Sequence, residues 1–416
     1  MLLIKRTAAY PLFLIYSGLT AFGFSMAFTV ASLYEVTVAG LNPLQLVLVG
    51  TTLEAAVFLF EVPTGVVADS FSRRLSIIIG LFLVGAGFIT EGLLPFFVPI
   101  LLAQVLWGVG YTFTSGALQA WISDEIGEER ANQAFLRARQ LEMLTGLAGI
   151  AAGTLLGRVN LAFPLVACGA LMALLGLGLI FTMPENGFKP TPSAERTTWG
   201  NMFETFRGGL RTVRQRPALR AILWIGLFYG LYSEGFDRLW VAHLLQNYSF
   251  PWAEPVVWMG LLRGTAMLLS VAAVEMVQRR VDVTRLRSLA GWIAAASAGI
   301  VLSLAGFAVT RWLPAALLLY LIISVLRNWV EPLYTAWVNQ RLDSQVRATV
   351  LSMSSQVDAI GQIGGGPLVG LVAQQVSITA ALLSSSALLT PVLGLIRPQL
   401  RAPNPPAAGQ GEDPRD

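Results

Sequence analysis

Apolar runs long enough to cross the hydrocarbon core of a bilayer as a helix, about 20 residues, recur along the whole chain between short polar segments. Six runs precede one longer polar interval and six follow it. The first run begins after Lys5 and Arg6 and is too long for the core of a secretory signal, so we expect it to remain as a helix. The pattern predicts twelve transmembrane helices, near residues 10–33, 44–67, 75–94, 97–122, 138–156 and 161–183, and near 218–240, 256–277, 286–309, 313–337, 346–372 and 378–396.

Composition leads to the same fold class. Of the 416 residues, 55% are hydrophobic and only 12% are charged. That leaves too little polar surface to cover a soluble globule of this size. The chain is therefore predicted to be an all-α membrane protein that crosses the lipid bilayer many times.

Two patterns repeat between the halves of the chain. Small residues are concentrated at 150–157 and again at 363–370. Such residues let helices approach closely and slide, although static tight packing uses them as well. A charge motif recurs after the second and the eighth apolar runs, and the two repeats predict pseudo-symmetric six-helix bundles at 1–183 and 218–396. The motif consists of Asp69, Arg73 and Arg74 in the first half and of Glu275, Arg279 and Arg280 in the second.

The polar interval at 184–217 is predicted to be a linker that contains an amphipathic helix. Apolar residues between positions 199 and 213 recur at helical spacing, with arginines between them. The helix either lies on the membrane surface with its basic face toward anionic lipids or packs as an ordinary linker helix. The tail at 397–416 is rich in Pro, Gly and charge, so we expect it to be disordered. Neither segment suggests a catalytic domain, and no enzyme is expected.

Basic residues predict the orientation. With the N-terminus in the cytoplasm, most of the 28 lysines and arginines fall in cytoplasmic segments, whereas the outer loops hold Arg158 and Arg311. The positive-inside rule then places both termini and the linker in the cytoplasm, in a multi-pass protein of the cell (inner) membrane. Because the basic charge is spread over many loops and forms no single patch, no nucleic-acid partner is expected.

The residues that bind common cofactors are scarce. Cys168 is the one cysteine and His243 the one histidine, so a disulfide framework or a Cys/His metal site is not expected. A phosphate-binding loop needs a Gly-Lys step, but Lys5 and Lys189, the two lysines, follow Ile4 and Phe188. We expect a monomeric protein without a cofactor. In the absence of a phosphate-binding loop, the expected energy source is an ion gradient, with protons as the coupling ion.

With six plus six helices and a basic central interval, the chain resembles the major facilitator superfamily of secondary transporters along nearly its whole length. Its loop motif between the second and third helices has the family's spacing at Gly65, Asp69, Arg73 and Arg74, with Ser72 at the position of a usual glycine. The resemblance implies that this motif, with Asp124 as the acid at the end of the fourth helix, latches the two halves when the cavity opens outward. The alternative is a cytoplasmic anchor that happens to contain an acid.

Within the superfamily, residues 60–65 and 233–240 are similar to bacterial drug and proton antiporters, which are multidrug-resistance efflux proteins. Two positions depart from that branch. Gln104 stands four residues before Gly108, where the branch usually carries arginine, and residues 149–153 lack its usual proline.

Ionisable residues at membrane depth are the candidate site, because a charge there is costly and usually functional. Glu54 and Asp358 fall near the predicted midplane and are candidates for proton coupling, although a midplane acid can also be a neutral structural group. Glu234 and Asp237 are further proton candidates. Together with Arg238 and Arg263 they predict either an outer gate or a fixed ion-pair staple. Arg327 and Glu331 stand four residues apart and predict either a self-neutralising pair or a cavity-facing selector of charged substrates.

The function predicted from these residues is proton-coupled efflux of small hydrophobic or amphipathic compounds by alternating access. The 22 Phe and 11 Trp supply apolar cavity walls, while few charged groups remain to define a polar ligand. The alternatives are proton-coupled uptake of a nutrient or metabolite, and a sensor of the same fold that transports nothing.

Overall fold

The computed structural model describes residues 2–190, 217–280, 285–340 and 344–400, together with positions 200 and 207, and every element in this part of the chain is helical. The amphipathic helix predicted in the linker and the tail from residue 401 on lie outside the described residues. The first bundle consists of α1 (Leu2–Thr37), α2 (Pro43–Ser70), α3 (Arg73–Leu93), α4 (Phe97–Ile126), α5 (Glu128–Val159) and α6 (Ala162–Thr182). The second consists of α8 (Pro217–Asn247), α9 (Pro255–Arg280), α10 (Leu286–Val309), α11 (Leu313–Gln340), α12 (Ser344–Gln375), α13 (Ile378–Leu389) and α14 (Pro391–Ile396).

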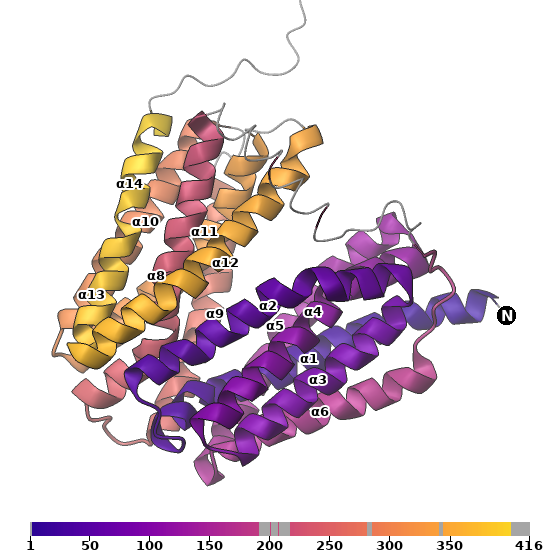
Figure 1. The fold of residues 1–416 in the computed structure, drawn as a ribbon, viewed down its shortest axis with the longest axis horizontal. Coiled ribbons are helices and arrows are strands. Elements are labelled where there is room, and N and C mark those ends of the chain that lie inside the picture. The colour runs from indigo at the N-terminus through magenta and orange to yellow at the C-terminus, as the bar shows by residue number, and fades with distance from the viewer. Residues whose placement is uncertain are drawn as a thin grey trace, which may run out of the picture.

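The predicted fold class is confirmed, because these helices form twelve membrane-crossing segments in two six-helix bundles (Figure 1). Within the described residues, nine helices are long and apolar enough to cross a membrane. The other three segments, α5, α8 and α12, carry many of the polar residues that line the centre of the molecule. The predicted disordered tail differs at its start, where Arg397–Leu400 form the short 3-10 helix η2.

Local chemistry sets the helix ends. Asn42 caps α2 through a reciprocal pair of hydrogen bonds with Gln45, at 2.9 and 3.0 Å. Gly127 has a φ of 85°, a conformation that favours glycine, and it separates α4 from α5. Helix α5 therefore begins at Glu128, well before the predicted start, because hydropathy marks only the part of a helix that lies in lipid. The last predicted span is broken before Pro391, which cannot continue the backbone ladder of α13.

The repeated small residues hold corresponding helices together in the two bundles. In the first bundle, a Cβ added to Gly149 or Gly153 would collide with backbone oxygens of α1. In the second bundle, a Cβ added to Gly361 or Gly365 would collide with backbone oxygens of α8. Helices α5 and α12 thus lie against α1 and α8 at a distance that only glycine allows, which fits the predicted internal symmetry.

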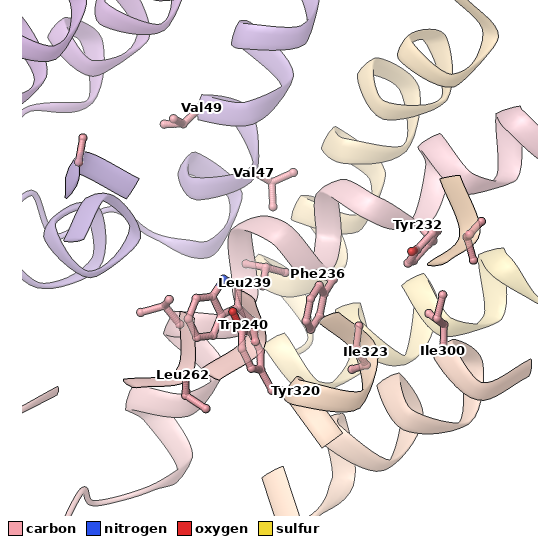
Figure 2. Packing of buried hydrophobic residues seen from close by; sticks show 14 of the residues in the cluster. Val47, Val49, Tyr232, Phe236, Leu239, Trp240, Leu262, Ile300, Tyr320 and Ile323 are labelled. Carbon is pink, nitrogen blue, oxygen red and sulfur yellow. The ribbon is translucent and has the colours of Figure 1, made fainter. Parts of the chain in front are cut away.

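Aromatic and aliphatic side chains form the core of the second bundle around α8. Figure 2 shows Phe236 and Trp240 from α8 beside Tyr320 from α11. The Trp240 and Tyr320 ring centroids are 4.4 Å apart, and those of Phe236 and Tyr320 are 6.1 Å apart. This packing fixes the orientation of α8 against α11, and α8 presents both aromatic and charged side chains to the cavity between the bundles.

The two bundles converge at one end and spread apart at the other (Figure 1). At the closed end, a Cβ on Gly370 of α12 would contact Leu44 of α2, and a Cβ on Gly157 of α5 would contact Val256 of α9. An ion pair between Arg158 and Glu254, with the nitrogen and oxygen 3.6 Å apart, also joins the bundles there. By the predicted topology, this closed end is the outer side of the membrane.

Candidate functional site

A central cavity of about 1000 Å³ lies between the two bundles. It continues into a space of about 900 Å³ between α2 and α12 and another of about 580 Å³ between α8, α11 and α12. Gln362 lines all three, so they are parts of one cavity system. The space beside α2 extends along the helix as far as Asp69, at the end where the bundles spread apart. By the predicted topology, the cavity is therefore open toward the cytoplasm.

The lining of the central cavity is more polar than the sequence suggested. The expectation that few charged groups would be left to define a ligand is wrong for this cavity, because α-helical burial in lipid concentrates charged side chains on the inner faces. Seven carboxylates and four guanidinium groups line it: Glu35, Glu54, Glu91, Glu142, Glu234, Asp237 and Glu331, with Arg139, Arg238, Arg263 and Arg327.

Glu54 and Asp358 line the same space between the two bundles. Helices α2 and α12 pack against each other across the two bundles, and both carboxylates line the space between these helices. Asp358 accepts a hydrogen bond from the side-chain amide of Gln362 at 2.8 Å. The two acids therefore face a solvent-connected cavity at the contact between the bundles, a position suited to a group whose charge state biases their movement.

Asp237 and Arg327 form a bidentate ion pair between α8 and α11. The two nitrogen–oxygen distances are 2.5 and 2.7 Å. The guanidinium carbon also lies 5.8 and 5.5 Å from the ring centroids of Tyr232 and Phe236. The predicted self-neutralising pair of Arg327 with Glu331 is therefore wrong. The i,i+4 spacing brought these two side chains to the same cavity, but the carboxylate on α8 offers Arg327 two parallel hydrogen bonds.

Glu234 and Arg238 form a second pair on α8, with the nitrogen and oxygen 3.6 Å apart. Helix α2 approaches this pair closely, because a Cβ on Gly50 would collide with both side chains. The predicted outer cluster of Glu234, Asp237, Arg238 and Arg263 is therefore divided. Asp237 forms its ion pair with Arg327, whereas Arg238 faces the first bundle. Arg263 lines the same cavity from α9.

Two acids in the first bundle were missed by sequence reasoning. Glu35 and Glu91 are 2% and 4% exposed, and both line the cavity beside Arg238. Gln104 donates a hydrogen bond to Glu91 at 3.0 Å, which gives a role to the residue that replaces the arginine usual in the antiporter branch. Both acids lie near the ends of apolar runs, where an acid reads as an ordinary boundary residue. The sequence signal that could have identified Glu35 and Glu91 was an acidic residue at the last turn of an apolar run.

An aromatic wall faces these carboxylates from the first bundle. Phe24, Phe28, Phe88 and Trp107 line the cavity. The ring centroids of Phe28 and Trp107 are 5.5 Å apart, and those of Phe28 and Phe88 are 5.8 Å apart. Aromatic faces beside carboxylates form a surface that attracts organic cations.

The first copy of the charge motif is assembled inside the first bundle. Arg73 forms an ion pair with Asp124 at the end of α4, and its guanidinium lies 4.0 Å from Asp69. Arg74 donates to the backbone oxygen of Ile180 at the end of α6. Asp69, Arg73 and Asp124 of the predicted latch therefore lie together, and the role of the latch in switching stays a prediction. In the second copy, Glu275 and the backbone of the two arginines end α9, while the arginine side chains lie outside the described residues.

The first residues after α6 are held against this motif. Glu185 accepts hydrogen bonds from the Ser72 hydroxyl at 2.7 Å and from the Arg74 backbone N–H at 2.9 Å. The Trp121 indole N–H donates to the backbone oxygen of Pro184 at 2.7 Å. Glu125 accepts from backbone N–H groups at positions 186 and 187. Residues 184–187 thus pack as part of the first bundle.

Neither the cysteine nor the histidine belongs to this site. Cys168 is buried in α6 and unpaired. His243 is 1% exposed and hydrogen-bonded to the backbone oxygen of Phe307 at 3.1 Å. Within the described residues, no three His, Cys, Asp or Glu side chains are placed to hold a metal ion.

Comparisons with solved structures agree with this architecture. A nucleoside transporter, NupG, superposes with a TM-score of 0.75 at 14% sequence identity, covering 95% of this chain and all of that one. A bacterial homolog of the human lysosomal transporter Spinster, in an inward-facing and occupied conformation, superposes with a TM-score of 0.72 at 13% identity, covering 95% of this chain and 97% of that one. At these identities the likeness concerns the fold alone.

Sequence comparison identifies the family. The chain is 22% identical over 346 residues to an uncharacterized MFS-type transporter, YxaM, of Bacillus subtilis (strain 168), and the match covers 81% of this chain and 82% of that protein. The sequence profile of the Major Facilitator Superfamily matches residues 12–366, which is most of the chain. The protein therefore belongs to the Major Facilitator Superfamily of transporters.

Proposed function

We propose that this protein is a proton-coupled secondary transporter that exports small amphipathic compounds, most of them carrying positive charge, by alternating access. The observation that carries the proposal is the central cavity of about 1000 Å³, which the two bundles share and in which acids outnumber arginines. The bundles touch at one end of this cavity and part at the other, as one of two alternating states requires.

The composition of the cavity supports an amphipathic substrate over a purely hydrophobic one. Burying an ionised group without a partner is costly, so a ligand that displaces water from these carboxylates must offer positive charge or hydrogen-bond donors. The rings of Phe24, Phe28, Phe88 and Trp107 accommodate the apolar part of such a molecule. Purely hydrophobic compounds would leave the carboxylates unpaired.

Proton coupling is supported by the position of the acids. Glu54 and Asp358 face the cavity from opposite bundles, and Glu234 and Asp237 lie deeper on α8. A carboxylate at such a position can bind a proton in one state and release it in the other, or exchange it for a cationic substrate. We propose these four residues as candidates for coupling, and the Arg73 motif as a latch between states.

Uptake of a polar solute is the second candidate. The polar lining favours it, and the fold is shared with the nucleoside transporter NupG. Export and uptake differ in the direction in which a given proton gradient drives the substrate across the membrane. A sensor that transports nothing would show no flux at all.

The test uses the purified protein in liposomes with an imposed pH gradient and two probes, the cationic dye ethidium and a neutral nucleoside. Export by exchange predicts that ethidium moves against the direction of the protons and that protons move only when the dye is present. Glu54→Gln should reduce this coupled flux, whereas Glu129→Gln, at an exposed position in the first turn of α5, should not. Nucleoside moving with the protons would establish uptake, and absence of flux for both probes would contradict transport of either class.

A further inference from the structure

The aromatic side chains of the first bundle form one cluster in the wall of the central cavity. Phe24 and Phe28 lie one turn apart on α1, Phe88 lies on α3 and Trp107 lies on α4. The centroid of the Trp107 ring is 5.5 Å from that of Phe28, 5.9 Å from that of Phe88 and 6.4 Å from that of Phe24. The two α1 rings are stacked, with centroids 5.9 Å apart. Rings at these separations form a packed aromatic surface for the flat apolar part of a ligand.

Glu91 lies beside this cluster and has one oxygen without a partner. It follows Phe88 by three residues on α3, so the two side chains share a face of that helix. The residue lines the cavity and is 4% exposed. Its Oε2 accepts a hydrogen bond from the Gln104 amide at 3.0 Å, whereas its Oε1 is buried and has no hydrogen-bond partner among the described residues. A bare buried carboxylate oxygen is costly, so this position calls for a donor that a ligand can bring.

The groups around Glu91 leave its carboxylate available to a cation. Gln104 is uncharged, so it orients the carboxylate without neutralising it. The Tyr34 hydroxyl donates at 2.9 Å to the backbone oxygen of Glu91 and not to the carboxylate. Arg238, which lines the same cavity, pairs with Glu234. Within the described ranges of the chain, no lysine or arginine forms an ion pair with Glu91, so a protonated amine can supply both the N–H and the charge.

The indole N–H of Trp107 is a second unpartnered group in the same wall. Its Nε1 atom is buried and has no acceptor in the part of the chain that the structure describes, although a buried indole N–H usually finds one. Trp107 follows Gln104 by three residues, which places it about 4.5 Å further along α4. The free acceptor on Glu91 and the free donor on Trp107 thus belong to positions about one helical turn apart. Both atoms are covered, so a ligand reaches them by displacing a neighbouring side chain.

We propose that Glu91, Gln104 and Trp107, with the three phenylalanines around them, form an amine site for aryl alkylamines that also carry an oxygen acceptor. The Oε1 atom of Glu91 accepts an N–H from the protonated amine, and the Trp107 N–H donates to an ether, hydroxyl or carbonyl oxygen a few bonds away. The rings hold the aryl group, and their faces attract the cation. Cations that carry no N–H fit this site less well, because Oε1 then stays unpaired.

The amine site rests on the cationic substrate class proposed above and adds a requirement to it. All six of its residues come from α1, α3 and α4 of the first bundle. Alternating access moves the two bundles largely as rigid bodies. The site therefore stays assembled in both states, so the first bundle can keep its hold on the amine while the second bundle changes its position.

The experiment compares two probes that differ in one hydrogen-bond donor. Propranolol is a secondary amine with an aryl ether and a hydroxyl group. Its N,N-dimethyl quaternary derivative keeps the ring, the oxygens and the positive charge but has no N–H on the nitrogen. Binding of each probe to the purified protein is measured by isothermal titration calorimetry in detergent at neutral pH, with no gradient. For the parent protein we expect propranolol to bind about 10- to 100-fold more tightly, the range for a hydrogen bond to a charged group.

Two variants should give different signatures. Glu91→Gln should weaken propranolol by about 10- to 100-fold and bring the two probes to similar affinity. The reason is that the new amide oxygen accepts from Gln104, so its NH2 group takes the place of Oε1 and donates. Trp107→Phe should weaken both probes by about 3- to 10-fold and keep the preference between them, because it removes a neutral hydrogen bond common to both.

Glu129→Gln, at the exposed position on α5, is the matched control for loss of a carboxylate and should bind both probes like the parent. Thermal unfolding checks that each variant is folded. Trp107→Phe keeps an aromatic ring at its position, so it gives an independent readout even where Glu91→Gln does not fold.

A parent protein that binds the two probes equally, or that does not bind propranolol, would overturn the amine site. So would a Glu91→Gln variant that keeps the preference for propranolol, or a Trp107→Phe variant that binds both probes like the parent. These outcomes are distinct from failure of the proposed function, because calorimetry requires no transport. Propranolol bound as expected without flux in liposomes would refute export alone, whereas ethidium flux with an unchanged preference in Glu91→Gln would refute the amine site alone.

Discussion

The ion pair between Asp237 and Arg327 allows a quantitative prediction about stability. Asp237→Asn removes the charge that neutralises Arg327 while keeping the shape of the side chain. Breaking a fully buried ion pair costs about 3–5 kcal/mol because an uncompensated charge remains. Here 27% of the arginine and 43% of the aspartate side chain are exposed to the cavity. Solvent therefore screens part of the loss, and we expect about 1.5–3 kcal/mol, the range for hydrogen bonds to charged groups.

This loss can be read as a change in melting temperature. With an unfolding entropy of about 2.1 cal/mol/K per residue, a chain of 416 residues has an unfolding entropy of about 0.9 kcal/mol/K. Asp237→Asn should then lower Tm by roughly 2–3 °C. The assay is thermal unfolding of the purified protein in a fixed detergent, followed by tryptophan fluorescence.

The exposed ion pair at the closed end is the matched control. Arg158 and Glu254 are 3.6 Å apart, with side chains 55% and 58% exposed. Exposed pairs contribute about 0.2–1 kcal/mol, so Glu254→Gln should lower Tm by no more than about 1 °C. Adding Arg327→Gln to Asp237→Asn should cost less than the sum of the two single changes, because it removes the orphaned charge. Equal effects of Asp237→Asn and Glu254→Gln, or strict additivity of the double change, would refute the reasoning.

Three further predictions test the motif, the helix contacts and the coupling. Arg73→Ala should slow transport severalfold while leaving substrate affinity nearly unchanged, because it biases two conformations without touching ligand; a parallel loss of affinity in binding titrations would contradict this. Gly361→Leu should sharply reduce folded protein, since even a Cβ meets backbone of α8, whereas Gly364→Ala meets open space and should purify normally by gel filtration. Glu54→Gln or Asp358→Asn should abolish uphill transport driven by a proton gradient but keep substrate exchange; unchanged uphill export in both variants would place the coupling proton elsewhere.

The fold was predictable because lipid imposes a strong constraint on each helix separately. A run of about 20 apolar residues must form a helix to satisfy its backbone, so the nine most apolar of the described helices follow from hydropathy alone. Helix length beyond the bilayer was not predictable in this way. The first turns of α5 are polar, and only Gly127 and the acids that follow it indicated where that helix begins.

The candidate site was predictable only for residues whose depth in a helix identifies them. Glu54 and Asp358 interrupt the middle of apolar runs, and both line the cavity. The partner of Arg327 was not predictable, because Asp237 is 90 residues away in the chain and is brought to it by tertiary packing. Local spacing pointed instead to Glu331. Glu91 was missed because the helix face on which a side chain lies near a helix end depends on neighbours that one sequence does not reveal.

The attachment of the chain after α6 has a mechanical consequence. Glu185 binds Ser72 and the backbone of Arg74, which flank Arg73 in the turn between α2 and α3. A pull on the chain beyond residue 187 would meet the hydrogen bonds of Glu125 with residues 186 and 187, and then the bonds of Glu185 with this turn, before it reached α6. The residues directly after α6 are thus bound to the neighbours of Arg73 and of Asp124 in the chain, so a movement transmitted to residues 184–187 would act on the predicted latch.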